Sequence, residues 1–92
     1  MKIEISSGDV VLSTAGKDEG KIFLVVKTEE RYAYLVDGKT RKADNPKRKS
    51  IKHLKVISKA RLQSLSSEIQ NGNPVGAKRI KRALANDKNI GG

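Results

Sequence analysis

Two apolar runs separated by a polar loop, near the N-terminus, constrain the fold of this chain more than any other feature. The runs are VVL at residues 10–12 and IFLVV at residues 22–26. β-branched and aromatic residues dominate both runs, which favours half-buried strands over helices. The segment between them, residues 14–21, is polar and holds two glycines. The sequence therefore predicts a β-hairpin with strands at about residues 9–13 and 21–27.

A third strand is predicted at residues 32–36, which read YAYLV. Asp37 and Gly38 follow it directly, and an Asp-Gly pair suits the type I′ turn of a tight hairpin. A short fourth strand is therefore expected at about residues 40–43. Together these segments predict a second hairpin after the first.

A loop and a closing strand complete the β region. Residues 43–50 are predicted to form a loop, because the Asn45-Pro46 pair opens a turn and basic residues follow it. Apolar residues return at residues 51–57, which predicts a fifth strand. Five short strands with frequent turns indicate a small barrel, and its closure would protect the continuous apolar second strand from lying at an edge. We expect this mainly β domain to cover residues 1–58.

Helical spacing replaces strand alternation after Ser58, which is placed to cap a first helix. Three apolar residues then fall at positions i, i+3 and i+7, one stripe of a helix: Leu62, Leu65 and Ile69. The sequence NGNP at residues 71–74 breaks that helix, and a second is predicted at about residues 74–86. Residues 59–92 thus form a helical extension. The second helix has an apolar side, Ala77, Ile80 and Leu84, and a basic side, Lys78, Arg79, Lys81 and Arg82.

Positive charge is concentrated in the second half of the chain. Residues 1–38 hold five Lys and Arg against seven Asp and Glu, a net charge of −2, whereas residues 39–58 hold eight against one, a net charge of +7. Residues 59–92 hold seven against two, a net charge of +5, and the whole chain carries +10. Such a nearly uniform sign raises the local potential and attracts polyanions. We expect a polyanion-binding protein, and a merely solubilising face is the alternative.

The first candidate binding surface is the basic segment at residues 39–55. Its cations can follow a phosphate backbone, since each neutralised phosphate releases counterions. The chain's one histidine is assigned to the same surface, because a lone His without Cys or a ligand cluster does not indicate a zinc site. A flexible loop that binds nothing specific is the alternative. The predicted RNA-binding residues here are Lys39, Arg41, Lys42, Lys47, Arg48, Lys49, Lys52, His53 and Lys55.

The second candidate surface is the loop at residues 14–21. Glycine allows backbone angles that a Cβ would oppose, and it lets a backbone approach RNA closely. A turn role alone is the alternative reading of the glycines, and two neighbouring acids weaken the positive field. The loop is not a P-loop, because three residues, not four, separate its glycines. The predicted site residues are Lys17 and Lys21, together with the two glycines of the loop, Gly16 and Gly20.

Tyr32 and Tyr34 share one face of the third predicted strand, because successive side chains alternate. Exposed aromatic rings on a sheet can stack on unpaired bases. The chain has only three aromatic residues, however, so we expect at least one of these two rings to pack in the core.

No constellation in the sequence indicates an enzyme. The acidic residues of the first half are adjacent pairs in turns, not an acid–base couple in a pocket. No Cys is present, so there are no disulfides, and neither a metal nor a cofactor is expected. No apolar run approaches the roughly 20 residues of a membrane span, and the N-terminus lacks the apolar core of a signal peptide. We expect a non-catalytic cytoplasmic protein with neither a membrane nor a small-molecule substrate as its partner.

Three segments carry a more specific signal in combination. They read TAGKDEGK at residues 14–21, YLVDGKTRK at residues 34–42 and NPKRKSIKHL at residues 45–54. Together they resemble the KOW-domain RNA-binding proteins of bacteria, with Gly20 at the signature glycine of the motif, and these are similar to KOW-bearing proteins of the archaeal and eukaryotic large ribosomal subunit. The resemblance covers about residues 8–58. It implies an SH3-like barrel that contacts structured RNA, with ribosomal RNA as the expected target.

We therefore expect a small SH3-like five-stranded KOW barrel with a basic helical extension, binding structured RNA by charge and shape. The basic side of the second helix is included in the predicted RNA-binding set: Lys78, Arg79, Lys81 and Arg82. The alternative is a protein-interaction module that docks on a ribosome- or transcription-associated partner through the apolar stripe of the first helix. Binding to an anionic membrane is a weaker hypothesis, because the predicted helices lack Trp and Phe as interfacial anchors.

Overall fold

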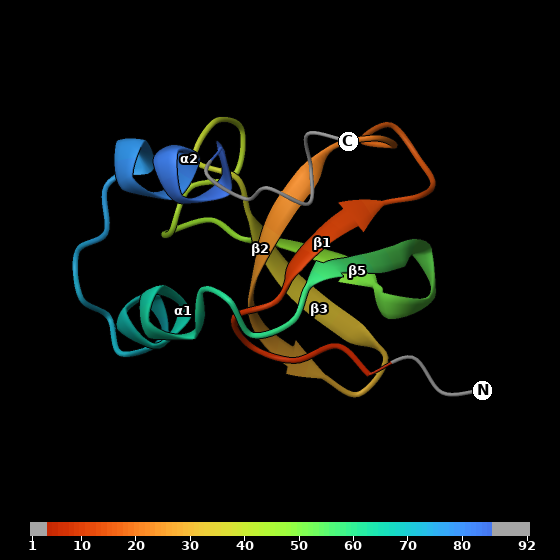
Figure 1. Cartoon of the computed structure of the whole chain (residues 1–92), viewed down its shortest axis with the longest axis horizontal. Helices are drawn as coiled ribbons and strands as arrows, with labels where there is room; N and C mark the ends of the chain where they lie inside the picture. The colour runs from red at the N-terminus through yellow and green to blue at the C-terminus, as the bar shows by residue number, and fades with distance from the viewer. Residues whose placement is uncertain (1–3, 86–92) are drawn as a thin grey trace.

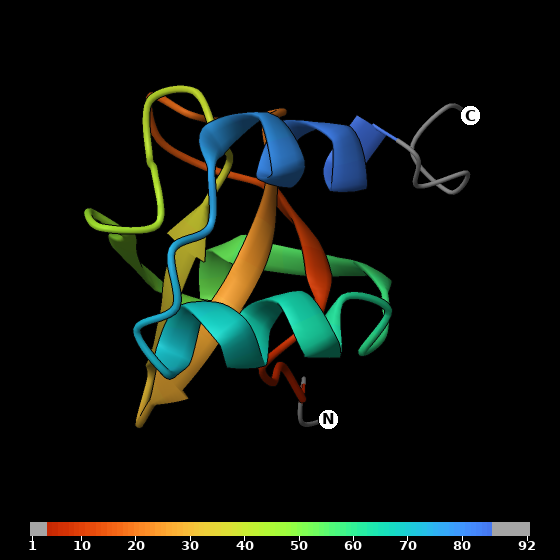
Figure 2. The same ribbon diagram turned by 90° about the vertical axis from the view of Figure 1, so that its left-hand side faces the viewer.

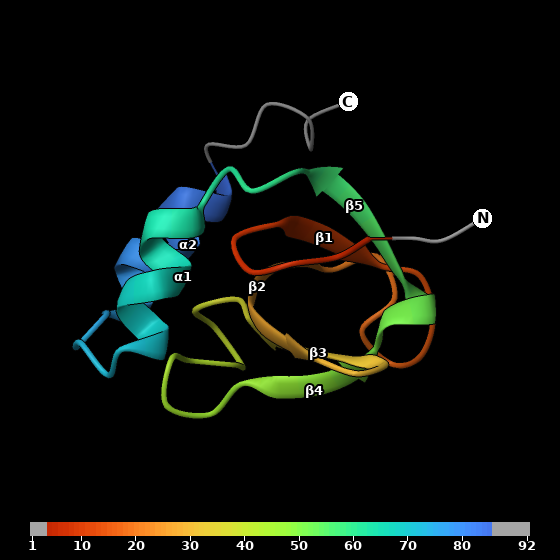
Figure 3. The ribbon, with the colours of Figure 1, turned by 90° about the horizontal axis from the view of Figure 1, so that it is seen from below.

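Five antiparallel strands dominate the computed structural model of the chain, which describes residues 4–85. They form one sheet in the order β4-β3-β2-β1-β5, so that the last strand lies beside the first (Figure 1). The sheet curves strongly but does not close: within residues 4–85, β4 pairs only with β3 and β5 only with β1 (Figure 3). The strands are β1 (Val10–Ser13), β2 (Ile22–Glu29), β3 (Tyr32–Val36), β4 (Lys47–Ser50) and β5 (Leu54–Ser58), with a short 3-10 helix, η1 (Ile51–His53), before β5.

The central strand, β2, is buried on both of its faces. Phe23 and Val25 belong to one core cluster, which lies inside the curve of the sheet together with Leu35. Leu24 and Val26 belong to a second cluster on the opposite face. We expected barrel closure to protect the continuous apolar run of this strand. The sheet stays open, but β2 does not lie at an edge because it pairs with β1 on one side and β3 on the other. The helices cover its second face and remove that apolar surface from water.

Two helices, α1 (Gln63–Gln70) and α2 (Ala77–Ala85), lie over that second face of the sheet (Figure 2). Leu65 of α1 is buried there, with Leu62 and Ile69 packed around it. Ile80 and Leu84 of α2 are buried in the same cluster. The predicted apolar stripes of both helices are therefore confirmed, and both serve to pack the helices on the sheet.

A β-bulge in β2 lets α1 form hydrogen bonds with the sheet. The pairing of β2 with β3 shifts register between Val25 and Lys27, which leaves Val26 out of the ladder. The buried hydroxyl of Ser66 donates to the Val26 carbonyl oxygen (2.7 Å), and Gln70 Nε2 donates to the same oxygen (2.6 Å). The bulge thus fixes the position of α1 beyond what apolar contact alone provides.

The predicted fourth strand is wrong, because β4 forms further along the chain. Residues 40–43 form no strand, and β4 occupies residues 47–50, which we expected to be a loop. The carboxylate of Asp37 is the physical reason, because it holds residues 37–41 as a wide loop in place of the predicted two-residue turn. It accepts hydrogen bonds from Lys39 N (2.8 Å), Arg41 N (2.9 Å) and the Thr40 hydroxyl (3.1 Å).

The helices begin later than the sequence predicts. Leu62, not Ser58, precedes the first turn of α1, and no side chain caps it. The second helix begins at Ala77, three residues after the predicted start, and the predicted last residue, Asn86, lies outside the described residues. Neither helix within residues 4–85 has the length and apolar character that crossing a membrane requires.

Replacing Ile80 by Ala should strongly destabilise the fold, because this side chain is fully buried between α2 and the sheet. A loss of about 2–5 kcal/mol in the free energy of unfolding is expected from the lost apolar contact and the cavity left behind. Urea unfolding followed by circular dichroism measures it. Arg82→Ala, at an exposed position of the same helix, is the control and should change stability by less than about 0.5 kcal/mol. Equal stability of the two variants would contradict the packing of α2 described here.

Candidate nucleic-acid interface

One end of the molecule brings together three basic segments that are far apart in the sequence. They are the β1–β2 loop at residues 14–21, the β3–β4 loop at residues 37–46, and α2 (Figures 1 and 2). We call this the basic end. No ion pair within residues 4–85 involves its exposed lysines or Arg82. Its exposed cations from the predicted set are Lys17, Lys21, Lys39, Lys42, Lys78, Arg79, Lys81 and Arg82, and Arg41 is half-buried beside them.

A buried ion pair ties the glycine-containing loop to β4. The Lys49 ammonium lies 2.7 Å from Oδ1 of Asp18 and donates to the carbonyl oxygen of Ala15 (2.8 Å). Both charged side chains are only 10% exposed. Lys47 Nζ lies 3.5 Å from Oδ2 of the same carboxylate. We expected both lysines to face RNA, but Lys49 holds the loop in shape and has no exposed charge to offer a phosphate.

These contacts keep Asp18 ionised. Burial alone would raise the pKa of Asp18, but hydrogen bonds from Lys49 and Ser13 and the charges of Lys49 and Lys47 outweigh it. The pKa of Asp18 is lowered from 3.8 to about 2. Its negative charge is therefore compensated inside the protein and does not offset the exposed lysines.

The two motif glycines adopt backbone angles that favour glycine, with φ of +85° at Gly16 and +89° at Gly20. A Cβ on Gly16 would lie 3.3 Å from Lys49 Nζ, so this glycine also makes room for the ion pair. A Cβ on Gly20 would meet nothing within 4 Å. The turn role is confirmed for both glycines, and only Gly20 leaves open space where a ligand can approach the backbone.

Arg48 lies away from the basic end, on the outer face of the β2–β3–β4 sheet. Its guanidinium stacks over the Tyr32 ring, 4.3 Å from the centroid, and Lys27 Nζ lies 4.8 Å from the centroid of Tyr34. The Tyr34 hydroxyl donates to Glu29 (2.9 Å). The predicted shared face of the two tyrosines is confirmed, but the prediction that one of them packs in the core is wrong. Three charged side chains surround the rings and hold them at the surface.

The sequence analysis missed Lys27 as a partner of this tyrosine face. Simple alternation along β2 would place Lys27 on the inner face with Phe23 and Val25. The bulge at Val26 shifts the register and places Lys27 opposite Tyr34, on the outer face. The bulge is not visible in the sequence, so neither is this contact.

The remaining predicted residues lie on η1 and β5. Lys52 and Lys55 are exposed, and His53 is half-buried. The His53 carbonyl oxygen accepts a hydrogen bond from Thr14 N (2.9 Å), so η1 adjoins the start of the β1–β2 loop (Figure 3). Lys52 and Lys55 therefore extend the basic end along η1 and β5.

Arg79 differs from its neighbours on α2, because it binds Glu68 of α1. Its two terminal nitrogens donate to the two carboxylate oxygens, at 2.8 and 2.5 Å. These hydrogen bonds lower the pKa of Glu68. Arg79 thus links the two helices, while Lys78, Lys81 and Arg82 lie at the surface and form no ion pair with any residue of the described part of the chain.

Within residues 4–85, no group of three or more His, Cys, Asp or Glu side chains is arranged to hold a metal ion. No protein-family model matches the chain, and no match is found among curated proteins. The function of the basic end is therefore inferred from its geometry and charge.

Asp18→Asn should flatten the acid dependence of stability. Because the folded-state pKa of Asp18 (about 2) lies below its ordinary 3.8, the ionised carboxylate stabilises the fold above about pH 4, and this stabilisation is lost as the pH falls toward 2. The effect amounts to about 2 kcal/mol. Urea unfolding at pH 7, 4 and 2 should show the unmodified protein losing about that much more than the variant.

Two features make this comparison specific. The pKa of Asp37, which burial would raise, is lowered by its hydrogen bonds to Arg41 and Lys39, but Asp37 titrates in both proteins and cancels in the difference. Glu19→Gln, at an exposed position of the same loop, is the matched control and should follow the unmodified protein. Identical pH profiles for the Asp18 variant and the unmodified protein would contradict the ion pair.

Proposed function

We propose that this protein binds structured RNA without catalysis and that the basic end is its contact surface. One observation carries the proposal: within residues 4–85, exposed lysines from three segments form no ion pair, while the carboxylates of Asp18 and Asp37 beside them are held in internal contacts. Exposed cations outnumber the exposed carboxylates of Glu19 and Asp44 at this end, on a protein with a net charge of +10. Such a surface attracts polyanions, of which nucleic acid is one.

The internal use of acids supports this charge separation. Asp9 is fully buried and pairs with Lys59 (2.9 Å). Asp18 pairs with Lys49, and Asp37 accepts hydrogen bonds within its own loop. These three carboxylates therefore stabilise loops and leave the exposed lysines uncompensated. Their structural roles also argue against their acting as an acid–base couple.

The arrangement of the cations favours a folded RNA over a flexible strand. They come from two loops and one helix, and the loops are fixed by the contacts of Asp18 and Asp37. Cations with fixed spacing match an RNA whose phosphates also have fixed positions. Such contacts set the orientation of the RNA but do not read its sequence.

We infer further that the curved sheet is an SH3-like barrel of the KOW type that stays open between β4 and β5. The pairing of the last strand with the first supports this inference. The position of Gly20, in the loop between β1 and β2 with open space beside it, supports the assignment of the motif glycine. A KOW barrel would make ribosomal RNA the expected target and the cytoplasm the place of action.

Docking on a protein partner is the alternative function, and its expected surface was the apolar stripe of α1. Leu65 is buried against the sheet, and Leu62 and Ile69 pack against the same cluster. The stripe is therefore covered by the protein itself. This leaves the charged surface as the stronger candidate for binding.

Replacing Lys17 and Lys81 together by Gln should weaken RNA binding and make it less sensitive to salt. Each phosphate contact contributes about 0.7–0.9 to the slope of log K against log salt concentration, so losing two contacts should reduce the slope by about 1.4–1.8. Fluorescence anisotropy with a folded RNA, repeated over a series of KCl concentrations, measures both quantities.

The matched control removes two exposed cations from the opposite end of the molecule. Lys27→Gln with Arg31→Gln, on the β2–β3 hairpin, has the same net charge as the test variant (Figure 1). It should retain the salt slope of the unmodified protein. Equal slopes for the two double variants would refute the basic end as the contact surface, and no RNA binding at low salt would refute the function.

A further inference from the structure

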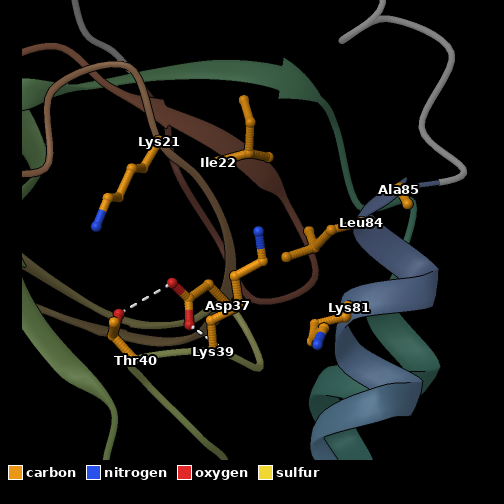
Figure 4. Close-up of a pocket in the computed structure, with 8 residues that line it drawn as sticks. All are labelled: Lys21, Ile22, Asp37, Lys39, Thr40, Lys81, Leu84 and Ala85. Atoms are coloured by element: carbon orange, nitrogen blue, oxygen red, sulfur yellow. Dashed lines mark hydrogen bonds between the residues drawn. The ribbon is translucent and has the colours of Figure 1, made fainter.

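A hollow of about 450 Å³ lies within the basic end, between the start of β2, the β3–β4 loop and α2 (Figure 4). Sites for small ligands span roughly 300–1,000 Å³, so the hollow has room for a ligand of that size. It is formed by three segments that only the fold brings together.

Cations from all three segments line the hollow: Lys21 before β2, Lys39 of the β3–β4 loop and Lys81 of α2. The Lys39 side chain extends from its loop toward Ile22 and Leu84 (Figure 4). Within residues 4–85, none of these three lysines forms an ion pair. The hollow is therefore electropositive.

The one carboxylate in the lining does not cancel this charge. Asp37 accepts hydrogen bonds from the backbone N–H groups of Lys39 (2.8 Å) and Arg41 (2.9 Å) and from the Thr40 hydroxyl (3.1 Å). Both carboxylate oxygens of Asp37 are thus hydrogen-bonded within the β3–β4 loop. A ligand that enters the hollow therefore meets ammonium groups to which no carboxylate of residues 4–85 is paired.

The remaining wall of the hollow is apolar. Leu84 of α2 points toward Ile22 of β2, and Ala85 lies beyond Leu84 at the end of the helix (Figure 4). An electropositive site with an apolar wall suits a ligand that has a flat apolar body and an anionic end. A nucleotide combines a base and a phosphate in this way.

The walls of the hollow are held together by close backbone packing. Gly38 has φ of +78°, and a Cβ at this position would lie 2.6 Å from the carbonyl oxygen of Ala77. The β3–β4 loop is therefore seated directly against the first turn of α2. The hollow is preformed, which limits the entropy lost when a ligand binds.

We propose that this hollow receives one unpaired nucleotide of the bound RNA, with its base against Ile22, Leu84 and Ala85 and its phosphates near the three lysines. The inference rests on the proposed function and adds selectivity to it. Phosphate contacts position an RNA without distinguishing its features, whereas a pocket for an extruded base selects RNAs that carry a bulge or an unpaired loop. A free nucleotide has the same chemistry and is a separate arm of the test.

The test compares two blunt RNA duplexes that differ only by one bulged adenosine, with AMP as the third probe. The unmodified full-length chain should bind the bulged duplex about tenfold more tightly than the paired duplex, and AMP weakly at most. Ala85→Phe places an aromatic ring at the exposed edge of the apolar wall and should reduce this ratio to about one. Ser67→Phe, which adds the same ring at an exposed position of α1, should keep the tenfold ratio.

A second measurement requires no variant. With 2-aminopurine in place of the bulged adenosine, binding of the unmodified protein should shield the fluorophore from acrylamide quenching. An affinity ratio of one, with the fluorophore still open to quenching, would overturn the hollow as a nucleotide site and leave RNA binding intact. AMP binding that is lost in Ala85→Phe, together with a ratio of one, would overturn the RNA version in favour of a free nucleotide. Failure to bind either duplex at low salt would overturn the proposed function as well.

Discussion

The burial of β2 on both faces is the constraint on which the rest of the structure depends. Phe23 and Val25 need the sheet to curve around them, whereas Leu24 and Val26 need helices to cover them. A single strand therefore joins two apolar clusters. Loss of either the sheet curvature or the helical layer would expose one face of β2 to water. The helices that follow β5 are therefore part of the packed core.

Buried carboxylates provide a second level of organisation, because each of them fixes a particular loop. Asp18 joins the β1–β2 loop to β4, and Asp37 shapes the β3–β4 loop from within. Asp9 connects the N-terminal segment to Lys59 and to the backbone of Ala60. These three carboxylates thus stabilise the fold, while most of the lysines and arginines lie at the surface. This division gives a protein with a modest core its strongly charged end.

The features that sequence predicted well are those set by local pattern. Apolar runs located β1, β2 and β3, and apolar stripes located both helices, since burial imposes a period of two or of 3.6 residues. The strand β4 was missed because KRKS has no apolar residue, and it becomes a strand only by pairing with β3 at the edge of the sheet. Its formation depends on a partner, not on its own composition.

The candidate site shows the same limit. The location of the charge was visible in the sequence, and so was the turn role of Gly16 and Gly20. The structural role of Lys49 could not be seen in the sequence, because its ion-pair partner Asp18 is 31 residues away and only the fold brings the two together. The sequence shows how many cations the chain has, but only the tertiary structure shows which of them are exposed and which form internal ion pairs.

The position of α2 has a consequence for the energetics of the whole molecule. The helix adheres to the sheet through Ile80 and Leu84 and turns Lys78, Lys81 and Arg82 to solvent. A polyanion bound to these cations would favour the folded helix over the frayed one. Binding and unfolding of α2 would therefore oppose each other, and the helix would be most stable with the polyanion bound.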